Sequence, residues 1–239
     1  MQVDAARGEV RISIVMFALT ATAGPVDAVT FLGLGRAFAA LATGNVLLLS
    51  FGVANAPGIS IARPAEALVA FVGGVAAAHA IVVTVSGRGR RWFVAALAGE
   101  VAVIAGAGVY AVIVSGTHSL PGHASAIVVV LLAAAMGWRS RTTVEAAIPD
   151  MPTTAVQISL VKAVADVLSF RTVPGRAPAL ARARRIGTVV GLFTGGVIGA
   201  LLLRLGPGPA LLSIAGLQAC VAALYSRAPR LRPPANAGH

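Results

Sequence analysis

The chain has 239 residues, of which 57% are hydrophobic and only 11% charged, and its mean hydropathy is +0.87. Soluble domains carry about 25% charged residues, so these values exclude an ordinary soluble globule, a disordered chain and a collagen. The formal net charge is +11. Its basic residues stand in short runs between apolar stretches, which favours the loop-charge pattern of a membrane protein over nucleic-acid binding.

Eight apolar stretches predict an all-α integral membrane protein. A bilayer-spanning helix needs about 20 apolar residues, and long runs without alternation exclude a β-barrel. We expect one polytopic membrane domain over residues 1–226 and a disordered, proline-containing tail over 227–239. The stretches cover residues 12–34, 37–55, 64–86, 92–115, 124–138, 152–170, 186–205 and 208–226.

The first stretch contains Gly24, Pro25 and Asp27. Proline removes a helical hydrogen bond, so we expect Gly24 and Pro25 to form a hinge at which a new half-helix starts. Asp27 then stands near the first turn of that half-helix. It either complements the helix dipole or forms a proton or cation site at a broken helix, and both interpretations stay open.

The second stretch carries Thr43, Gly44 and Asn45 in apolar surroundings. A hydroxyl, a flexible backbone and an amide at this place favour a solute-binding cavity at the tip of a re-entrant segment. The alternative is hydrogen bonding between helices.

Glu100 lies about two turns inside the fourth stretch. Acidic groups at bilayer depth are functional candidates, so Glu100 is a candidate proton carrier. Pairing with a basic arginine of a loop is the interpretation that we favour. In the sixth stretch Lys162 and Asp166 stand four residues apart and can neutralise each other, which favours an interfacial helix over a span.

Loop charge decides between the span counts. If all eight stretches cross, 11 basic residues lie on one side and 7 on the other. If stretches 37–55 and 152–170 are re-entrant or interfacial, six spans place 16 basic residues on the side of both termini, and only Arg36, Arg63 and Arg204 opposite. We therefore predict about six spans, with seven or eight as alternatives. Seven spans give 15 against 4.

An internal repeat is suggested by Phe71-x-Gly73-Gly74-Val75, which recurs as Phe193-x-Gly195-Gly196-Val197. With six spans, each half (about 12–115 and 124–226) has three crossings, so the halves are inverted relative to each other. Inverted repeats are a recurrent design of secondary transporters. The glycines at a spacing of four residues indicate close helix packing.

Two groups of residues carry a resemblance to a known family. The run Ala23-Gly24-Pro25-Val26-Asp27-Ala28, followed by Phe38 and then Thr43-Gly44-Asn45, resembles the YoaK-like family of uncharacterised bacterial multi-pass inner-membrane proteins. In the second half, Ala135-Met136-Gly137 and the run 149–154 are similar to a later motif of that family. The chain departs from the family where Trp138-Arg139-Ser140-Arg141 replaces a Leu-Gln-Asn type run, and where Gln157-Ile158 replaces a Thr-Gly pair.

No catalytic signature is found in the sequence, which contains no zinc-protease, nucleophile-elbow or phosphate-loop motif; we expect no enzyme activity, cofactor or metal. The first functional hypothesis is a secondary transporter for a small solute, an ion or protons, with a midplane site. The alternative is a non-transporting membrane scaffold or partner protein. Expected partners are the lipid bilayer, anionic headgroups at the run from Arg171 to Arg185, an unknown solute or ion and a second copy of the chain, but no nucleic acid. The resemblance implies the bacterial inner membrane, and loop charge predicts a cytoplasmic C-terminus.

Overall fold

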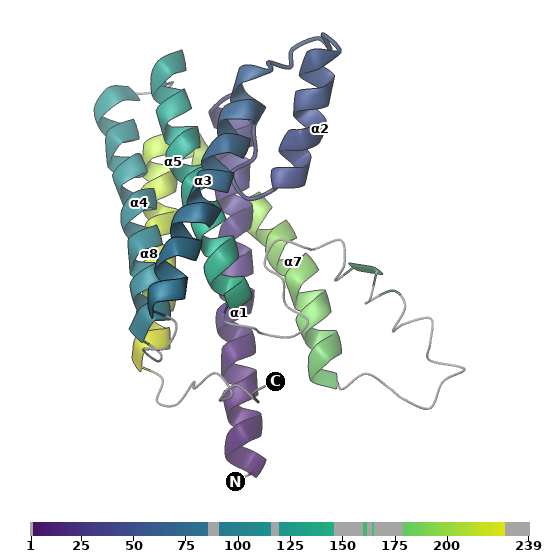
Figure 1. Cartoon of the computed structure of the whole chain (residues 1–239), viewed down its shortest axis with the longest axis vertical. Helices are drawn as coiled ribbons and strands as arrows, with labels where there is room; N and C mark the ends of the chain where they lie inside the picture. The colour runs from purple at the N-terminus through teal and green to yellow at the C-terminus, as the bar shows by residue number, and fades with distance from the viewer. Residues whose placement is uncertain are drawn as a thin grey trace.

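The computed structural model describes residues 2–85, 91–115, 120–145, 160–161, 164 and 179–227. Within these ranges every regular element is a helix, which confirms the all-α prediction. The elements are α1 (Gln2–Gly33), α2 (Ala42–Val53), α3 (Ala62–Val85), α4 (Arg91–Ser115), α5 (Gly122–Glu145), α7 (Ala179–Leu202), the short 3₁₀ helix η3 (Leu203–Leu205) and α8 (Pro207–Arg227) (Figure 1).

Helix lengths agree with a multi-pass membrane protein. Five helices (α3, α4, α5, α7 and α8) are long and apolar enough to cross a bilayer, and α1 contributes the apolar part Phe17–Gly33. α2 has only 12 residues, or about 18 Å of helix, which is too short for a hydrocarbon core of about 30 Å. Apart from residues 160, 161 and 164, the predicted segment 152–170 lies outside the described residues, as does the tail after Arg227.

The long helices alternate in direction (Figure 1). α1, α4 and α7 run away from the end of the molecule where α1 begins, here named the lower end, and α3, α5 and α8 run back from the upper end. α1 therefore begins, and α8 ends, at the lower end. α2 begins below the upper ends of α3 and α5 and rises to their level, so the chain enters the bundle after α1 and returns through α2.

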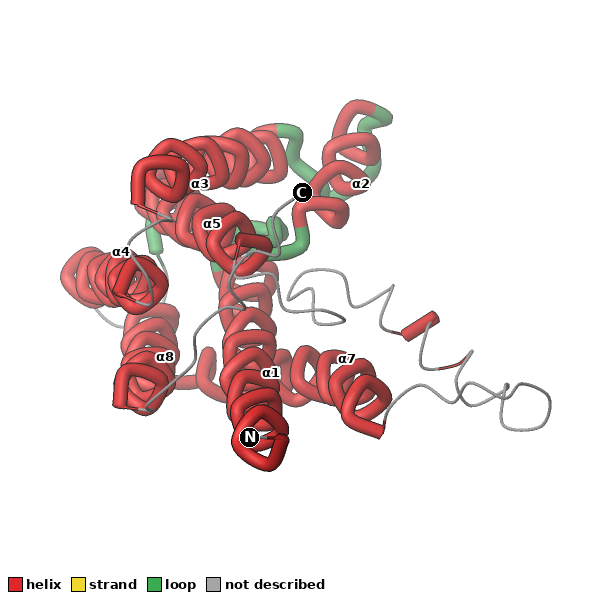
Figure 2. Tube along the Cα trace, turned by 60° about the horizontal axis from the view of Figure 1, so that its bottom comes forward, coloured by secondary structure: helices red, strands yellow, loops and turns green. Residues whose placement is uncertain are grey.

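Two parallel helix pairs are packed through glycine. α1 lies along α7, and α3 lies along α5 (Figure 2). A side chain on Gly74 would collide with the carbonyl oxygen of Ala134, and one on Gly137 with that of Phe71. Likewise, a side chain on Gly24 would collide with Leu192 O, and one on Gly195 with Ala21 O. The missing side chains thus let the backbones approach closely.

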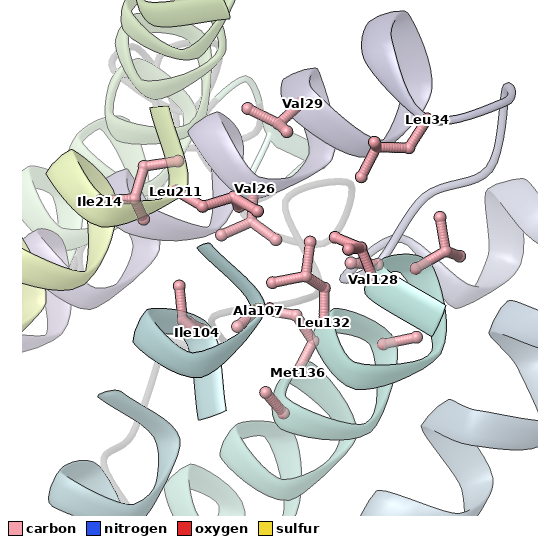
Figure 3. Packing of buried hydrophobic residues seen from close by; sticks show 14 of the residues in the cluster. Val26, Val29, Leu34, Ile104, Ala107, Val128, Leu132, Met136, Leu211 and Ile214 are labelled. Atoms are coloured by element: carbon pink, nitrogen blue, oxygen red, sulfur yellow. The ribbon is translucent and has the colours of Figure 1, made fainter. Parts of the chain in front are cut away.

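The apolar core lies between α1, α4, α5 and α8 (Figure 3). α1 contributes Val26 and Val29, which face Leu132 of α5 and Leu211 of α8 across the bundle. The segment 34–41 is also part of this core, because Leu34, Ala37, Ala39 and Ala40 are buried. A non-helical segment at this depth needs internal partners for its backbone polar groups.

The predicted break at Gly24 and Pro25 was wrong. α1 continues through Pro25 to Gly33 without interruption. Pro25 cannot donate to the carbonyl oxygen of Ala21, but that oxygen lies against Gly195 of α7. Because the neighbouring helix covers the freed carbonyl, the proline is tolerated inside the span.

Candidate functional site

Asp27 lies on α1 where the non-helical segment 34–41 passes. Its side chain is buried, and Oδ1 accepts a hydrogen bond of 2.7 Å from the backbone N–H of Ala40. The backbone N–H groups of Ala39 and Leu41 also lie near the carboxyl group. Oδ2 is buried and accepts no hydrogen bond from the part of the chain that the structure describes. Asp27 therefore holds the chain just before α2 and keeps one acceptor oxygen unused.

Asn45 closes the same segment from the other side. The side chain is fully buried. Its Oδ1 accepts a hydrogen bond of 2.8 Å from the backbone N–H of Phe38, and its Nδ2 donates one of 2.6 Å to the carbonyl oxygen of Phe38. The ring of Phe38 stacks on Phe31 at 4.6 Å between centroids. Asn45 thus satisfies both backbone polar groups of a residue that cannot take part in a helix.

The other two residues of the predicted motif have different surroundings. Gly44 lies against the ring of Phe38, because a side chain there would approach Cδ2 to 2.8 Å. Thr43 is exposed in the first turn of α2. The structure therefore brings Asp27, Gly44 and Asn45 together around the segment 38–41. A role of these residues or of Thr43 in solute binding stays a prediction.

Glu100 belongs to a second polar cluster, which joins four helices. Its carboxylate forms an ion pair with Arg139 of α5 and accepts a hydrogen bond of 2.8 Å from Nε2 of Gln218 on α8. Arg139 also donates two hydrogen bonds to α1, one of 2.9 Å to the carbonyl oxygen of Leu19 and one of 3.1 Å to Oγ1 of Thr22. Glu100, Arg139 and Gln218 are each about 2% exposed.

The arginine of this cluster corrects a sequence interpretation. Hydropathy ended the fifth stretch at residue 138 and assigned Arg139 to a loop, whereas α5 continues to Glu145 and buries Arg139. Gln218 and Thr22 were missed as well. The available signal was a single amide or hydroxyl inside an otherwise apolar run, because such groups seek partners in lipid.

The cluster is polar but incompletely satisfied. Arg139 Nε and Gln218 Oε1 are buried and make no hydrogen bond with the described residues. Removing one partner of a buried ion pair leaves a charge without compensation, which costs far more than losing an exposed pair. Arg139 and Glu100 therefore depend on each other for their place in the bundle.

A third set of contacts lies at the upper end. Arg63 at the start of α3 pairs with Glu66 at 2.8 Å and donates to the carbonyl oxygen of Gly122 and, at 3.0 Å, to Oγ of Ser125. Ser125 Oγ lies 3.2 Å from the carbonyl oxygen of Leu34. These contacts join the upper ends of α1, α3 and α5.

α1 and α5 are thus connected by polar contacts at two levels. We name the contacts of Arg139 with Leu19 and Thr22 the lower latch, and those of Ser125 with Leu34 and Arg63 the upper latch. Elsewhere the backbones of α1 and α5 come close to each other at few places, and their apolar side chains meet in the core between them. Asp27 lies on α1 between the two latches, about 12 Å along the helix from Leu19 and about 10 Å from Leu34 at 1.5 Å per residue.

Metal binding finds no support among the described residues, where no group of three His, Cys, Asp or Glu side chains could hold an ion. The comparisons with known proteins give one result. A family model described as "Protein of unknown function (DUF1275)" matches residues 15–224. Neither the curated proteins nor the solved structures contain a significant match to the chain.

Proposed function

The chain belongs to the family described as Protein of unknown function (DUF1275), and from its buried polar groups we propose that it is a secondary transporter for a small solute, coupled to protons or a cation. The observation that carries the proposal is Asp27, a buried carboxylate on α1 that lies beside the start of α2 and whose Oδ2 accepts no hydrogen bond from the described residues. Ionisable groups within the membrane typically mark substrate or ion pathways. Half-helix termini at mid-depth are typical of such sites in transporters.

The roles that we propose for the predicted site residues differ from one another. Asp27 Oδ2 would take the proton or cation, and Thr43 would contact the solute from the first turn of α2. Asn45 and Gly44 would position the segment 38–41 rather than bind solute, because both are engaged with Phe38. Glu100 would act through its ion pair with Arg139, and Gly24 and Pro25 would hold α1 close against α7.

The two latches support a mechanism of alternating access. One latch lies on each side of Asp27, and each joins α1 to α5 by a few polar contacts. Opening one latch while the other stays closed would expose Asp27 to one side of the membrane at a time. In this proposal the structure with both latches closed is the occluded state.

The glycine contacts support an inverted repeat. Ala21 and Gly24 of α1 make the same reciprocal contacts with Leu192 and Gly195 that Ala134 and Gly137 of α5 make with Phe71 and Gly74. α1 and α5 run in opposite directions, as do α3 and α7 (Figure 1). This correspondence aligns Phe71 with Leu192 rather than with Phe193, so the repeat that we propose differs by one residue from the one suggested by the Phe-x-Gly-Gly motif.

The proposed location is the inner membrane, with the lower end in the cytoplasm. Among the described residues, eight basic residues lie within or near helix ends at the lower end: Arg7, Arg11, Arg91, Arg141, Arg182, Arg184, Arg185 and Arg227. At the upper end stand Arg36, Arg63 and Arg204. Cytoplasmic loops carry the excess of basic residues.

Transport can be measured without knowing the solute. Purified protein in proteoliposomes would be placed on a solid-supported membrane and exposed to jumps of H⁺, Na⁺, K⁺ and a panel of amino acids, organic acids, sugars and nucleosides. We expect a charge movement for at least one solute in the wild type. Asp27→Asn should abolish it, because the amide cannot exchange a proton or neutralise a cation.

The matched control is Glu145→Gln, which makes the same acid-to-amide change at the partly exposed end of α5. It should retain the wild-type signal. Equal signals from Asp27→Asn and the wild type, with both variants folded by gel filtration, would refute the role of Asp27. A wild type that is silent for every ion and solute would refute electrogenic transport of the tested solutes.

One observation favours the alternative of a non-transporting scaffold or partner protein. Asp27 and Asn45 both have a complete structural task, since they supply the partners of a backbone segment inside the bundle. If that were their only role, Asp27→Asn would lower the melting temperature without any flux to lose. A stable stoichiometric complex after extraction in mild detergent would then be expected.

A further inference from the structure

A groove at the upper end lies between α1 and α2. It has a volume of about 520 Å³ and is lined mainly by apolar side chains, among them Phe31 and Leu32 of α1, Leu48 of α2 and Ile59 of the following loop. Leu32 is 60% exposed. An open apolar groove on the outer surface of a membrane-spanning bundle faces lipid acyl chains.

One charged side chain lies in this groove. Arg36 donates 3.0 Å from Nη1 to the carbonyl oxygen of Gly58, in the loop that joins the upper ends of α2 and α3. The guanidinium therefore stands at the upper mouth of the groove, and the apolar lining lies deeper along α1 and α2. Gly58 has a φ of +74°, and a side chain there would meet Nη1 at 2.8 Å, so the glycine is what allows Arg36 to be held at this point.

No carboxylate of the described residues compensates the charge of Arg36. A guanidinium has five N–H donors, and the structure gives Arg36 one hydrogen bond, to a neutral carbonyl. Within the described residues no carboxylate pairs with it, because Glu66, the acid at this end, pairs with Arg63. The backbone at Arg36 has a φ of +60°, a conformation that non-glycine residues rarely adopt.

We propose that this groove is a binding site for one anionic phospholipid, with the phosphate on Arg36 and an acyl chain along Phe31, Leu32 and Leu48. Arginine is well suited to phosphate because its planar donors match the phosphate oxygens. A headgroup with net negative charge is favoured over a zwitterionic one, because the groove offers a cation and no acid to receive a choline or ethanolamine. The proposal is independent of transport.

The test is native mass spectrometry of the full chain in detergent, titrated with phosphatidylglycerol or with phosphatidylcholine of the same acyl chains. We expect one phosphatidylglycerol to bind at a concentration at least about tenfold lower than phosphatidylcholine, because both lipids carry a phosphate but only phosphatidylglycerol has a net negative charge opposite the guanidinium. Arg36→Gln should remove this preference. Arg204→Gln, a change of the same kind in an exposed arginine at the same end, should keep it.

A second variant tests the groove itself and does not alter the charge. Leu48→Trp fills the apolar lining and should weaken binding of phosphatidylglycerol by a similar factor although Arg36 is intact. Inorganic phosphate at millimolar concentration should not displace the lipid. Equal binding of the two lipids, an equal loss in Arg204→Gln, or full displacement by inorganic phosphate would each overturn the proposal.

Discussion

At the scale of single residues, the polar groups inside the bundle divide into two kinds. Asn45 is matched by its surroundings, since each of its two functional atoms faces one backbone group of Phe38. Asp27, Arg139 and Gln218 each have at least one buried side-chain atom that makes no hydrogen bond with the described residues. Buried polar atoms without partners are costly, so these atoms lower the stability of the bundle unless a ligand, a proton or water meets them.

The ion pair of Glu100 and Arg139 gives the clearest residue-scale prediction. Glu100→Gln and Arg139→Gln should each lower the free energy of unfolding by about 3–5 kcal/mol, because each strands a buried charge. The double variant should be less destabilised than the sum of the two, since no charge is left. Unfolding in a graded mixture of mild detergent and dodecyl sulfate measures all three.

The control for this cycle is the pair Arg141 and Glu145 near the end of α5, which is partly exposed. Arg141→Gln and Glu145→Gln should each change the free energy of unfolding by about 0–1 kcal/mol. Additive effects at Glu100 and Arg139 would show that the pair is not coupled, contrary to the structure.

At the scale of helices, the bundle depends on which of two adjacent glycines faces the neighbour. In α3, Gly74 lies against the backbone of Ala134, whereas Gly73 has no atom within 4 Å of the place where a side chain would begin. In α7 the order is reversed, because Gly195 is packed and Gly196 is open. The sequence pattern is the same in both helices, but the contact face is rotated by one residue.

Alanine substitutions test this difference within one dipeptide. Gly74→Ala and Gly195→Ala should each lower the free energy of unfolding by about 1–3 kcal/mol, because the methyl group forces the helices apart. Gly73→Ala and Gly196→Ala should be neutral or slightly stabilising, since alanine is the better helix former. Thermal unfolding in detergent distinguishes the four variants. Equal losses from Gly73→Ala and Gly74→Ala would contradict the packing of α3 on α5.

At the scale of the whole molecule, α2 decides the membrane topology. If α2 is re-entrant, the segment between α1 and α2 and the loop between α2 and α3 lie on the same side of the membrane. If α2 crosses, they lie on opposite sides. The directions of the helices put the start of α1 and the end of α8 together at the lower end (Figure 1). Five of the described helices are long and apolar enough to cross a membrane, and α1 adds the shorter apolar part Phe17–Gly33, so the count of six spans stays a prediction.

Cysteine labelling checks that topology. In a background in which Cys220 is replaced by Ala, Arg36→Cys and Asn55→Cys should both react in intact cells with a membrane-impermeant maleimide. Ser226→Cys should react only after the membrane is permeabilised. Opposite accessibility of positions 36 and 55 would instead support the seven-span alternative.

The sequence predicted the architecture better than the contacts. Composition and stretch length were sufficient for an all-α membrane bundle, and the lone polar residues Asp27, Asn45 and Glu100 were found because charge and amide groups are rare in lipid. Their partners were not, since Ala40, Phe38 and Arg139 are brought to them by tertiary packing. Arg139 was misplaced because hydropathy cannot distinguish a helix that ends from one that buries a charge. The prediction at Pro25 failed because the carbonyl oxygen of Ala21, which Pro25 leaves without a donor, is covered by Gly195 of α7, a helix that is distant in the sequence.

The pairing of α1 with α7 also has a consequence for biosynthesis. Residues 34–178 separate the end of α1 from the start of α7, its main packing partner. At a synthesis rate of ~5–20 residues per second, roughly 7–30 s pass between the synthesis of α1 and that of α7. During that interval its glycine face, with Gly24 and the freed carbonyl of Ala21, is covered only by lipid or by the insertion machinery. The bundle can therefore close only when translation is nearly finished. A chain truncated before α7 would leave α1 unpaired in the membrane and a substrate for quality-control proteases.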